Sequence, residues 1–147
     1  MGKRESLNQY IAEVRLKPLV FTEHDCLTFT NNAFRKMYGE GWADDWLGRY
    51  NKGSRPKQLQ EEFGYKSLLK GIDDKLTRIK YVPPLGALIA TKQAQRWITG
   101  FALGISNGKC GVFLSEKGLM QLPFDVVNYS WIRQNEEQPT IQCTKRI

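Results

Sequence analysis

The sequence is poor in the residues that build common metal and disulfide sites. Its 147 residues include one histidine and three cysteines. A single histidine excludes a site with several histidine ligands within this chain. The cysteines, Cys26, Cys110 and Cys143, are odd in number and form no Cys-x-x-Cys pair, which argues against a zinc ribbon and a disulfide framework. We therefore expect neither a metal nor a cofactor.

Long hydrophobic runs are also lacking. No segment approaches the ~18 apolar residues of a membrane-spanning helix. Residues 1–6 are polar and lack the apolar core of a signal peptide, so any route out of a cell would need another carrier. What the chain does have is 41% hydrophobic and 12% aromatic residues, which predicts a packed core rather than disorder. Without repeats or a linker, this length indicates one domain.

Positive charge exceeds negative charge. Lysine and arginine total 22 against 15 acidic residues, for a net charge of +7. Such a balance raises polyanions, such as nucleic acid or cell-wall polymers, as partners. The basic residues are scattered, however, and no zinc finger or other nucleic-acid motif is present. A solvated basic surface is favoured, and a DNA-facing role is kept as an alternative.

The first third of the chain predicts two helices. The Ser6–Gln9 segment has the pattern of a capping box, and apolar residues follow at helical spacing until Pro18. A short extended segment, residues 19–21, comes next. Asp25 is the expected N-cap of the second helix, and Gly39 is its expected end. One face of that helix carries Cys26, Phe29, Ala33 and Met37, which places Cys26 in the first turn on the side of the core.

The middle of the chain is rich in aromatic residues. Trp42, Trp46 and Tyr50 recur at a helical spacing of four. Core packing is the favoured interpretation, and a platform that stacks on sugars or bases is the alternative. A short helix is expected over 56–63, ended by Gly64, and one or two more over 65–80.

After Pro83-Pro84 the pattern changes to strands. Asn107-Gly108 predicts a hairpin turn, because both residue types tolerate positive φ. We expect strands at 85–90, 96–105, 110–114, 119–122 and 129–132. Helices followed by an antiparallel meander define an α+β fold, with the N-terminal helices packed on a C-terminal sheet. We expect residues 1–134 to form the domain and 135–147 to be a polar tail or docking arm.

This plan resembles the NlpC-like branch of the papain-like cysteine peptidases, which cut peptidoglycan peptides. Asp25-Cys26 opens a helix, as the corresponding pair does in that branch. The Pro84–Ile89 segment is similar to its turn and first strand, and Ala102–Ile105 to the signature of its second strand. The resemblance implies a papain-like fold.

A phage-encoded group of unknown function is still more similar. Its members resemble the NlpC-like branch and occur among tail-assembly genes. The matching segments are Leu19–Phe29, which contains His24-Asp25-Cys26, then Trp46–Tyr50, and finally Trp131–Arg133. Together the similarity spans most of residues 5–133.

The resemblance also shows a departure. Where NlpC-like enzymes have their catalytic histidine, this chain has Ala102, and the third polar member of the triad is not identifiable. The candidate site residues are Cys26 as nucleophile, His24 as an unusual base, and Asp25. A helix N-terminus and an imidazolium both lower the pKa of a thiol. The competing interpretation treats Cys26 as a small buried residue and Asp25 as a helix cap. Contact between the His24 and Cys26 side chains is not favoured by their spacing.

Three functional hypotheses follow. The first is a bacteriophage virion protein of the tail or head–tail connector, made in the host cytoplasm and acting in an assembly through contacts with other virion proteins. It would carry a degenerate NlpC-like fold without enzymatic activity. The alternative is a cysteine hydrolase of peptidoglycan with Cys26 as nucleophile. The third is a basic virion component that faces DNA.

Overall fold

The computed structural model describes residues 2–20, 23–50, 55–92 and 101–134. Helices come first and strands follow, which confirms the α+β prediction. The helices are α1 (Lys3–Val14), α2 (Cys26–Tyr38), α3 (Arg55–Phe63) and α4 (Leu68–Lys75). The strands are β1 (Leu76–Ile79), β2 (Leu88–Thr91), β3 (Ala102–Ser106), β4 (Gly111–Ser115), β5 (Gly118–Leu122) and β6 (Val127–Arg133), with a short 3₁₀ helix, η1 (Phe124–Val126), before β6.

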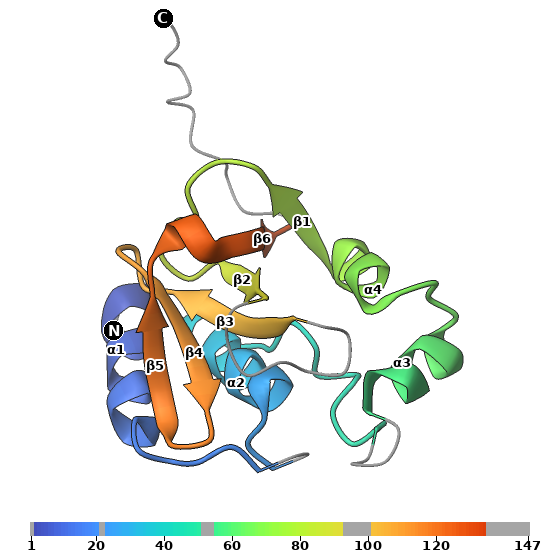
Figure 1. Ribbon diagram of the computed structural model, residues 1–147, viewed down its shortest axis with the longest axis horizontal. Helices are drawn as coiled ribbons and strands as arrows, with labels where there is room; N and C mark the ends of the chain where they lie inside the picture. Colours follow the sequence, from blue (N-terminus) through green and yellow to red (C-terminus); the bar gives the residue numbers. More distant parts are fainter. Residues whose placement is uncertain (1, 21–22, 51–54, 93–100, 135–147) are drawn as a thin grey trace, which may run out of the picture.

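The six strands form one antiparallel sheet in the order β1-β6-β2-β3-β4-β5 (Figure 1). Strands β2 to β5 follow each other as the predicted meander. Strand β6 then returns across the sheet and inserts between β1 and β2. Trp131 on β6 lies opposite Arg78 of β1 on one side and Leu88 of β2 on the other.

The sheet presents one face to the helices α1 and α2, with α1 beside β5 and α2 beside β3 and β4 (Figure 1). Alternation along β3 decides which side chains join that layer. Leu103 and Ile105 belong to the main core with the helices. Ala102 points to the opposite face, where it packs with Ile89 and Phe113.

Helix α1 begins earlier than its capping pattern predicted. Gly2 is the N-cap, and its N–H donates to the Glu5 carboxylate at 3.3 Å, so the start expected at Ser6 is wrong. The predicted apolar stripe is confirmed, because Leu7 and Val14 are buried. The helix ends ahead of Pro18, as expected.

The end of α1 is joined to the far edge of the sheet. The Leu119 N–H of β5 donates to the Arg15 carbonyl oxygen at 2.9 Å. Gly118 makes this approach possible, since a Cβ at that position would lie 2.5 Å from the same oxygen, and its φ is +118°. The β5 edge is therefore covered at this point by the chain that leaves α1.

The segment 41–50 contains turns rather than a helix. Trp42, Trp46 and Tyr50 are nevertheless buried, which confirms core packing as their role. The region 65–80 was only partly predicted. Helix α4 forms, but residues 76–79 are the strand β1, which pairs with β6, so the expected helix is wrong there.

The hairpin at Asn107-Gly108 is confirmed in position. Its loop spans residues 107–110 between the paired Ser106 and Gly111, so it is longer than a two-residue turn. The Asn107 side-chain oxygen accepts from the N–H groups of Lys109 and Cys110, and Gly108 has a φ of +92°. The first part of the strand expected at 96–105, residues 96–100, lies outside the described residues, as does the expected tail, residues 135–147.

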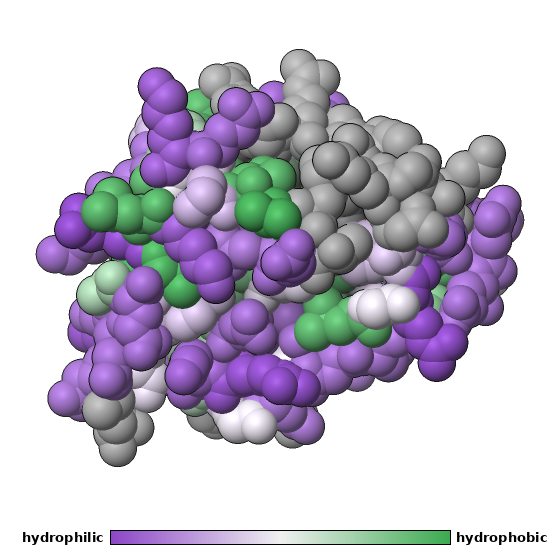
Figure 2. Space-filling model, turned by 90° about the horizontal axis from the view of Figure 1, so that it is seen from below, coloured by the Kyte–Doolittle hydropathy of each residue, from purple (hydrophilic) through white to green (hydrophobic). Residues whose placement is uncertain are grey.

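The surface is mainly hydrophilic where it can be seen. Figure 2 shows one face with hydrophilic residues over most of its area and several separate hydrophobic patches. Among the described helices, none combines the length and apolar character required to cross a membrane.

Candidate functional site

Cys26 occupies the first turn of α2, as predicted, and its thiol is sealed in the core. The residue is 6% exposed and packs in the main cluster of the protein. Burial, followed by the negative charge of Asp25, raises the pKa of the Cys26 thiol to about 12. Backbone hydrogen bonds, including one with Leu103 on β3, oppose this shift without cancelling it. The helix N-terminus therefore fails to make Cys26 a thiolate at neutral pH.

Asp25 caps α2 and is buried. One carboxylate oxygen accepts from the Thr28 N–H at 2.9 Å, and the Thr28 hydroxyl in turn accepts from the Asp25 N–H at 2.7 Å. The other oxygen accepts from the Tyr50 hydroxyl at 2.6 Å. The carboxylate is thus committed to holding the helix start and a tyrosine from the 41–50 segment.

Tyr50 is the partner that sequence reasoning missed. It was interpreted as core, which is correct for its ring, but its hydroxyl reaches Asp25. Burial and the Asp25 charge raise the pKa of Tyr50 far above its ordinary value, so it remains a hydrogen-bond donor. A buried tyrosine needs a partner for its hydroxyl, and a buried cap residue is a natural one. That need was the available signal, although it does not name the partner.

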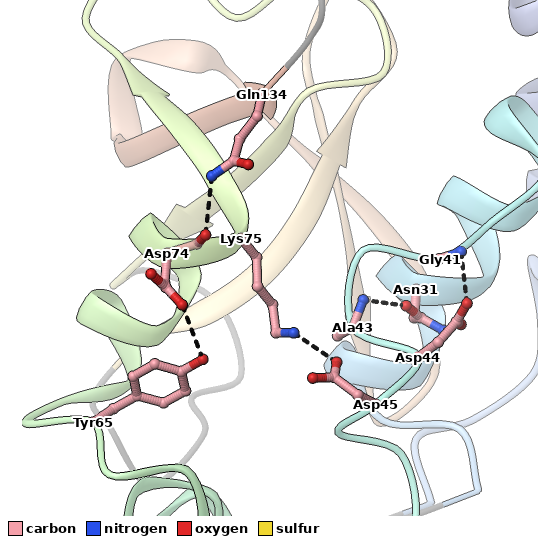
Figure 3. Close-up of polar contacts among 9 residues, drawn as sticks. All are labelled: Asn31, Gly41, Ala43, Asp44, Asp45, Tyr65, Asp74, Lys75 and Gln134. Atoms are coloured by element: carbon pink, nitrogen blue, oxygen red, sulfur yellow. Dashed lines mark hydrogen bonds and ion pairs between the residues drawn. The ribbon is translucent and has the colours of Figure 1, made fainter.

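The tyrosine is delivered by a loop that two sets of contacts hold (Figure 3). The Asn31 side chain of α2 accepts from the Ala43 N–H at 2.6 Å and donates to Asp44 at 2.7 Å. On the other side, the ammonium of Lys75 pairs with Asp45 at 2.6 Å. The loop is therefore fastened to α2 and to the end of α4, which fixes the position from which Tyr50 enters the core.

His24 does not join this group as a base. Its ring is buried and meets Phe29 edge-on, with centroids 6.3 Å apart. Its backbone forms an isolated antiparallel bridge with Val20. The His24 N–H donates to the Val20 carbonyl oxygen with N···O 2.7 Å, and the Val20 N–H donates to the His24 carbonyl oxygen with N···O 2.9 Å. Within the described part of the chain, its Nε2 has no hydrogen-bond partner. His24 is also not among the groups that shift the pKa of Cys26.

The strand position expected to carry the missing histidine also faces away. Ala102 lies on the side of the sheet opposite the helices, with Ile89 and Phe113. The β3 residue against Cys26 is Leu103, and its neighbour on the same face is Phe101. Neither can act as a base. The structure therefore brings Asp25 and Cys26 together with Tyr50, and it places no imidazole from β3 beside the thiol.

The buried His24 makes stability depend on pH. Burial lowers the pKa of His24 below its usual 6.5, the Lys17 charge lowers it further, and Asp25 opposes both. The unfolded chain then takes up a proton at higher pH than the native one. The contribution of His24 to the free energy of unfolding is therefore fully present above about pH 6.5, and it is lost as the pH falls towards the pKa of His24 in the native state. Urea unfolding between about pH 7 and 5 should show this loss.

The control for this dependence is His24→Gln, which has no proton to gain. Its stability should vary less with pH across that range than the stability of the wild type. The carboxyls of Asp44 and Asp73 do not affect the comparison. Burial raises their pKa values, but hydrogen bonds outweigh it and lower them below 3.8, so both groups titrate below the pH range that is compared. An equal slope for the variant and the wild type would show that His24 is not the titrating group.

Over residues 2–20, 23–50, 55–92 and 101–134, no group of three or more histidine, cysteine, aspartate or glutamate residues is arranged to hold a metal ion. The buried cluster instead offers one carboxylate and two protonated weak acids. Such a set can stabilise a helix start, but it supplies no activated nucleophile.

Comparison with known proteins identifies a family. No curated protein and no solved structure matches the chain. The model of the family described as a domain of unknown function, DUF6950, matches residues 2–132. This match covers most of the sequence, including the helix start at Asp25-Cys26, the strands β1 to β5 and all of β6 except Arg133. The chain belongs to the DUF6950 family.

Proposed function

We propose that this chain is a non-catalytic structural protein of a bacteriophage virion, located in the tail or head–tail connector. It would use a degenerate papain-like scaffold to make contacts with other virion proteins. The observation that carries the non-catalytic part is the sealed Cys26 thiol. The virion assignment is supported by the resemblance of Leu19–Phe29, Trp46–Tyr50 and Trp131–Arg133 to a tail-associated phage group.

A cysteine hydrolase needs a thiolate, a base that receives its proton and an open approach for the substrate. Cys26 meets none of these conditions in the described structure. Its thiol is buried and its pKa is raised to about 12. The neighbouring Asp25 accepts hydrogen bonds from Thr28 and Tyr50, and its charge disfavours a second anion beside it. The same groups that would form an active site serve the fold.

Thiol labelling separates this proposal from the hydrolase. With a pKa of about 12, the Cys26 thiolate amounts to roughly one molecule in 10,000 at pH 8. In a chain with Cys110→Ser and Cys143→Ser, we expect a maleimide to react with Cys26 at least about 100-fold more slowly than with a free thiol. Mass spectrometry over a time course measures the rate.

The matched control carries Cys26→Ala and keeps the other two cysteines. Labelling in that variant reports the rate of ordinary thiols in the same protein. Peptidoglycan digestion by the wild type completes the comparison. Rapid labelling of Cys26, together with muropeptide release that Cys26→Ala abolishes, would establish the hydrolase instead.

The virion assignment is tested on particles. We expect peptides of this chain in phage particles purified through two density gradients, at a constant ratio to the major tail protein. Absence from such particles, with the protein present in the lysate, would contradict the assignment. A DNA-facing role would add binding to duplex DNA that weakens steeply as salt is raised. Retention on DNA at low salt distinguishes that alternative from a purely protein-bound component.

A further inference from the structure

A cleft of about 660 Å³ lies away from the Cys26 cluster, where β1 and β6 separate. One wall is the end of β1 and the chain that leaves it, residues 78–83. The other wall is formed by Phe124 and Asp125 of η1 and by residues 127–130 of β6. Its lining is mixed. Tyr81, Phe124 and Tyr129 supply aromatic surface, and Val82 is 71% exposed at its rim.

The cleft exists because β6 is longer than its neighbour. Strand β6 spans Val127–Arg133, but β1 pairs with it only from Ile79 opposite Ser130 to Leu76 opposite Arg133. Beyond Ile79 the chain departs from the sheet. The described backbone contains no hydrogen bond between residues 80–83 and residues 127–129. On the β1 side, the first three residues of β6 therefore have no strand partner among the described residues, although β2 pairs with β6 on the other side.

We propose that this cleft binds an extended peptide segment of a partner protein, which adds to the sheet beside residues 127–129 of β6. Unpaired strand edges recruit extended segments through their main-chain groups, and the side pockets then give specificity. The open stretch is three residues, or roughly 10 Å of strand. Both existing neighbours of β6 are antiparallel to it, so the added segment runs in the direction of β1.

That direction fixes which end of the peptide meets which charge. The segment enters next to Lys80, where β1 leaves, and ends near Asp125 in η1, just before β6 begins. Both side chains line the cleft and are exposed, and neither has an ion-pair partner among the described residues. Arg78, by contrast, is already paired with Asp73 at 2.8 Å.

The partner segment should therefore carry an acidic residue at its N-terminal end and a basic residue at its C-terminal end. Between them, β-branched residues suit an extended conformation against the aromatic walls. This inference does not rest on the virion assignment, because it follows from the sheet and the cleft alone. A failure of either leaves the other standing.

The test uses the full-length chain, labelled with ¹⁵N, and the blocked peptide acetyl-Glu-Val-Thr-Val-Lys-amide. NMR titration should shift the amide signals of residues 79–83 and 125–130. Methylating the backbone nitrogen of the central residue of the peptide should weaken binding about tenfold if that nitrogen donates to β6, and methylating its two neighbours in turn covers the other register. At least one of the three methylated peptides must lose this affinity.

Charge reversal gives a second readout on folded protein. The variant with Lys80→Glu and Asp125→Lys should prefer the reversed peptide, acetyl-Lys-Val-Thr-Val-Glu-amide, by about fivefold, whereas the wild type prefers the original. Lys117→Glu, an exposed change in the β4–β5 turn, is the matched control and should behave as the wild type. Shifts confined to other residues, equal binding by all methylated peptides, or an unchanged preference after charge reversal would overturn the proposal.

Discussion

The Asp25→Ala variant is expected to lose about 3 kcal/mol of unfolding free energy, because it removes the N-cap of α2 and the carboxylate that accepts the hydrogen bond of the buried Tyr50 hydroxyl. Loss of an Asp cap costs about 1 kcal/mol, and a buried donor left without its acceptor costs about 1–3 kcal/mol more. The contacts concerned are the Thr28 N–H at 2.9 Å and the Tyr50 hydroxyl at 2.6 Å. Urea unfolding followed by tryptophan fluorescence measures the change.

Two further variants separate the contributions. Asp25→Ser keeps a side-chain oxygen for the cap but does not restore a carboxylate for Tyr50, so its loss should be intermediate. Tyr50→Phe removes the donor and leaves the cap in place, at a cost of about 1–2 kcal/mol. If Asp25→Ala cost less than Tyr50→Phe, Asp25 would not organise this cluster.

The Trp131→Ala variant is expected to cost about 4 kcal/mol, within the range for emptying a large buried aromatic site. Trp131 is 0% exposed and lies on the central part of β6, between β1 and β2. Its indole N–H donates to the Asp73 carboxylate at 2.8 Å, so the residue also links β6 to α4. Thermal and urea unfolding should both report the loss.

Trp131→Phe is the informative comparison. It retains an aromatic ring in the core but leaves Asp73 without the indole donor, and its cost should be clearly smaller than that of the alanine variant. Val82→Ala is the surface control, since a change at an exposed side chain is usually within about 0.5 kcal/mol. Similar losses for the alanine and phenylalanine variants would show that the hydrogen bond, rather than ring burial, dominates.

Sequence reasoning succeeded where the determinants are local. Asp25 as N-cap, Gly39 as C-cap and Cys26 on the inward face of α2 were all predicted from neighbours within four residues. The Asn107-Gly108 turn was predicted for the same reason. Caps, turns and helix faces depend on residues that lie close together in the sequence, so they can be predicted without a structure.

It failed where distant segments decide the outcome. Residues 76–79 become β1 because β6, more than fifty residues later, pairs with them. The partnership of Tyr50 with Asp25 likewise depends on how hydrogen bonds hold the 41–50 segment to α2. The direction of the Ala102 side chain depends on the register of the sheet, and a one-residue shift would reverse it. None of these can be read from periodicity alone.

The hydrogen bond between Leu119 of β5 and the Arg15 carbonyl has a consequence for biosynthesis. The first helix and the last strand of the meander depend on each other, although they lie near opposite ends of the chain. As the ribosome releases the protein, α1 emerges early and must wait for β5 before its end is secured. Contacts between residues so far apart in the sequence slow folding, because the chain must lose the conformational entropy of the long intervening loop before the contacts can stabilise it. We therefore expect the domain to complete its folding only after β5 has left the ribosome.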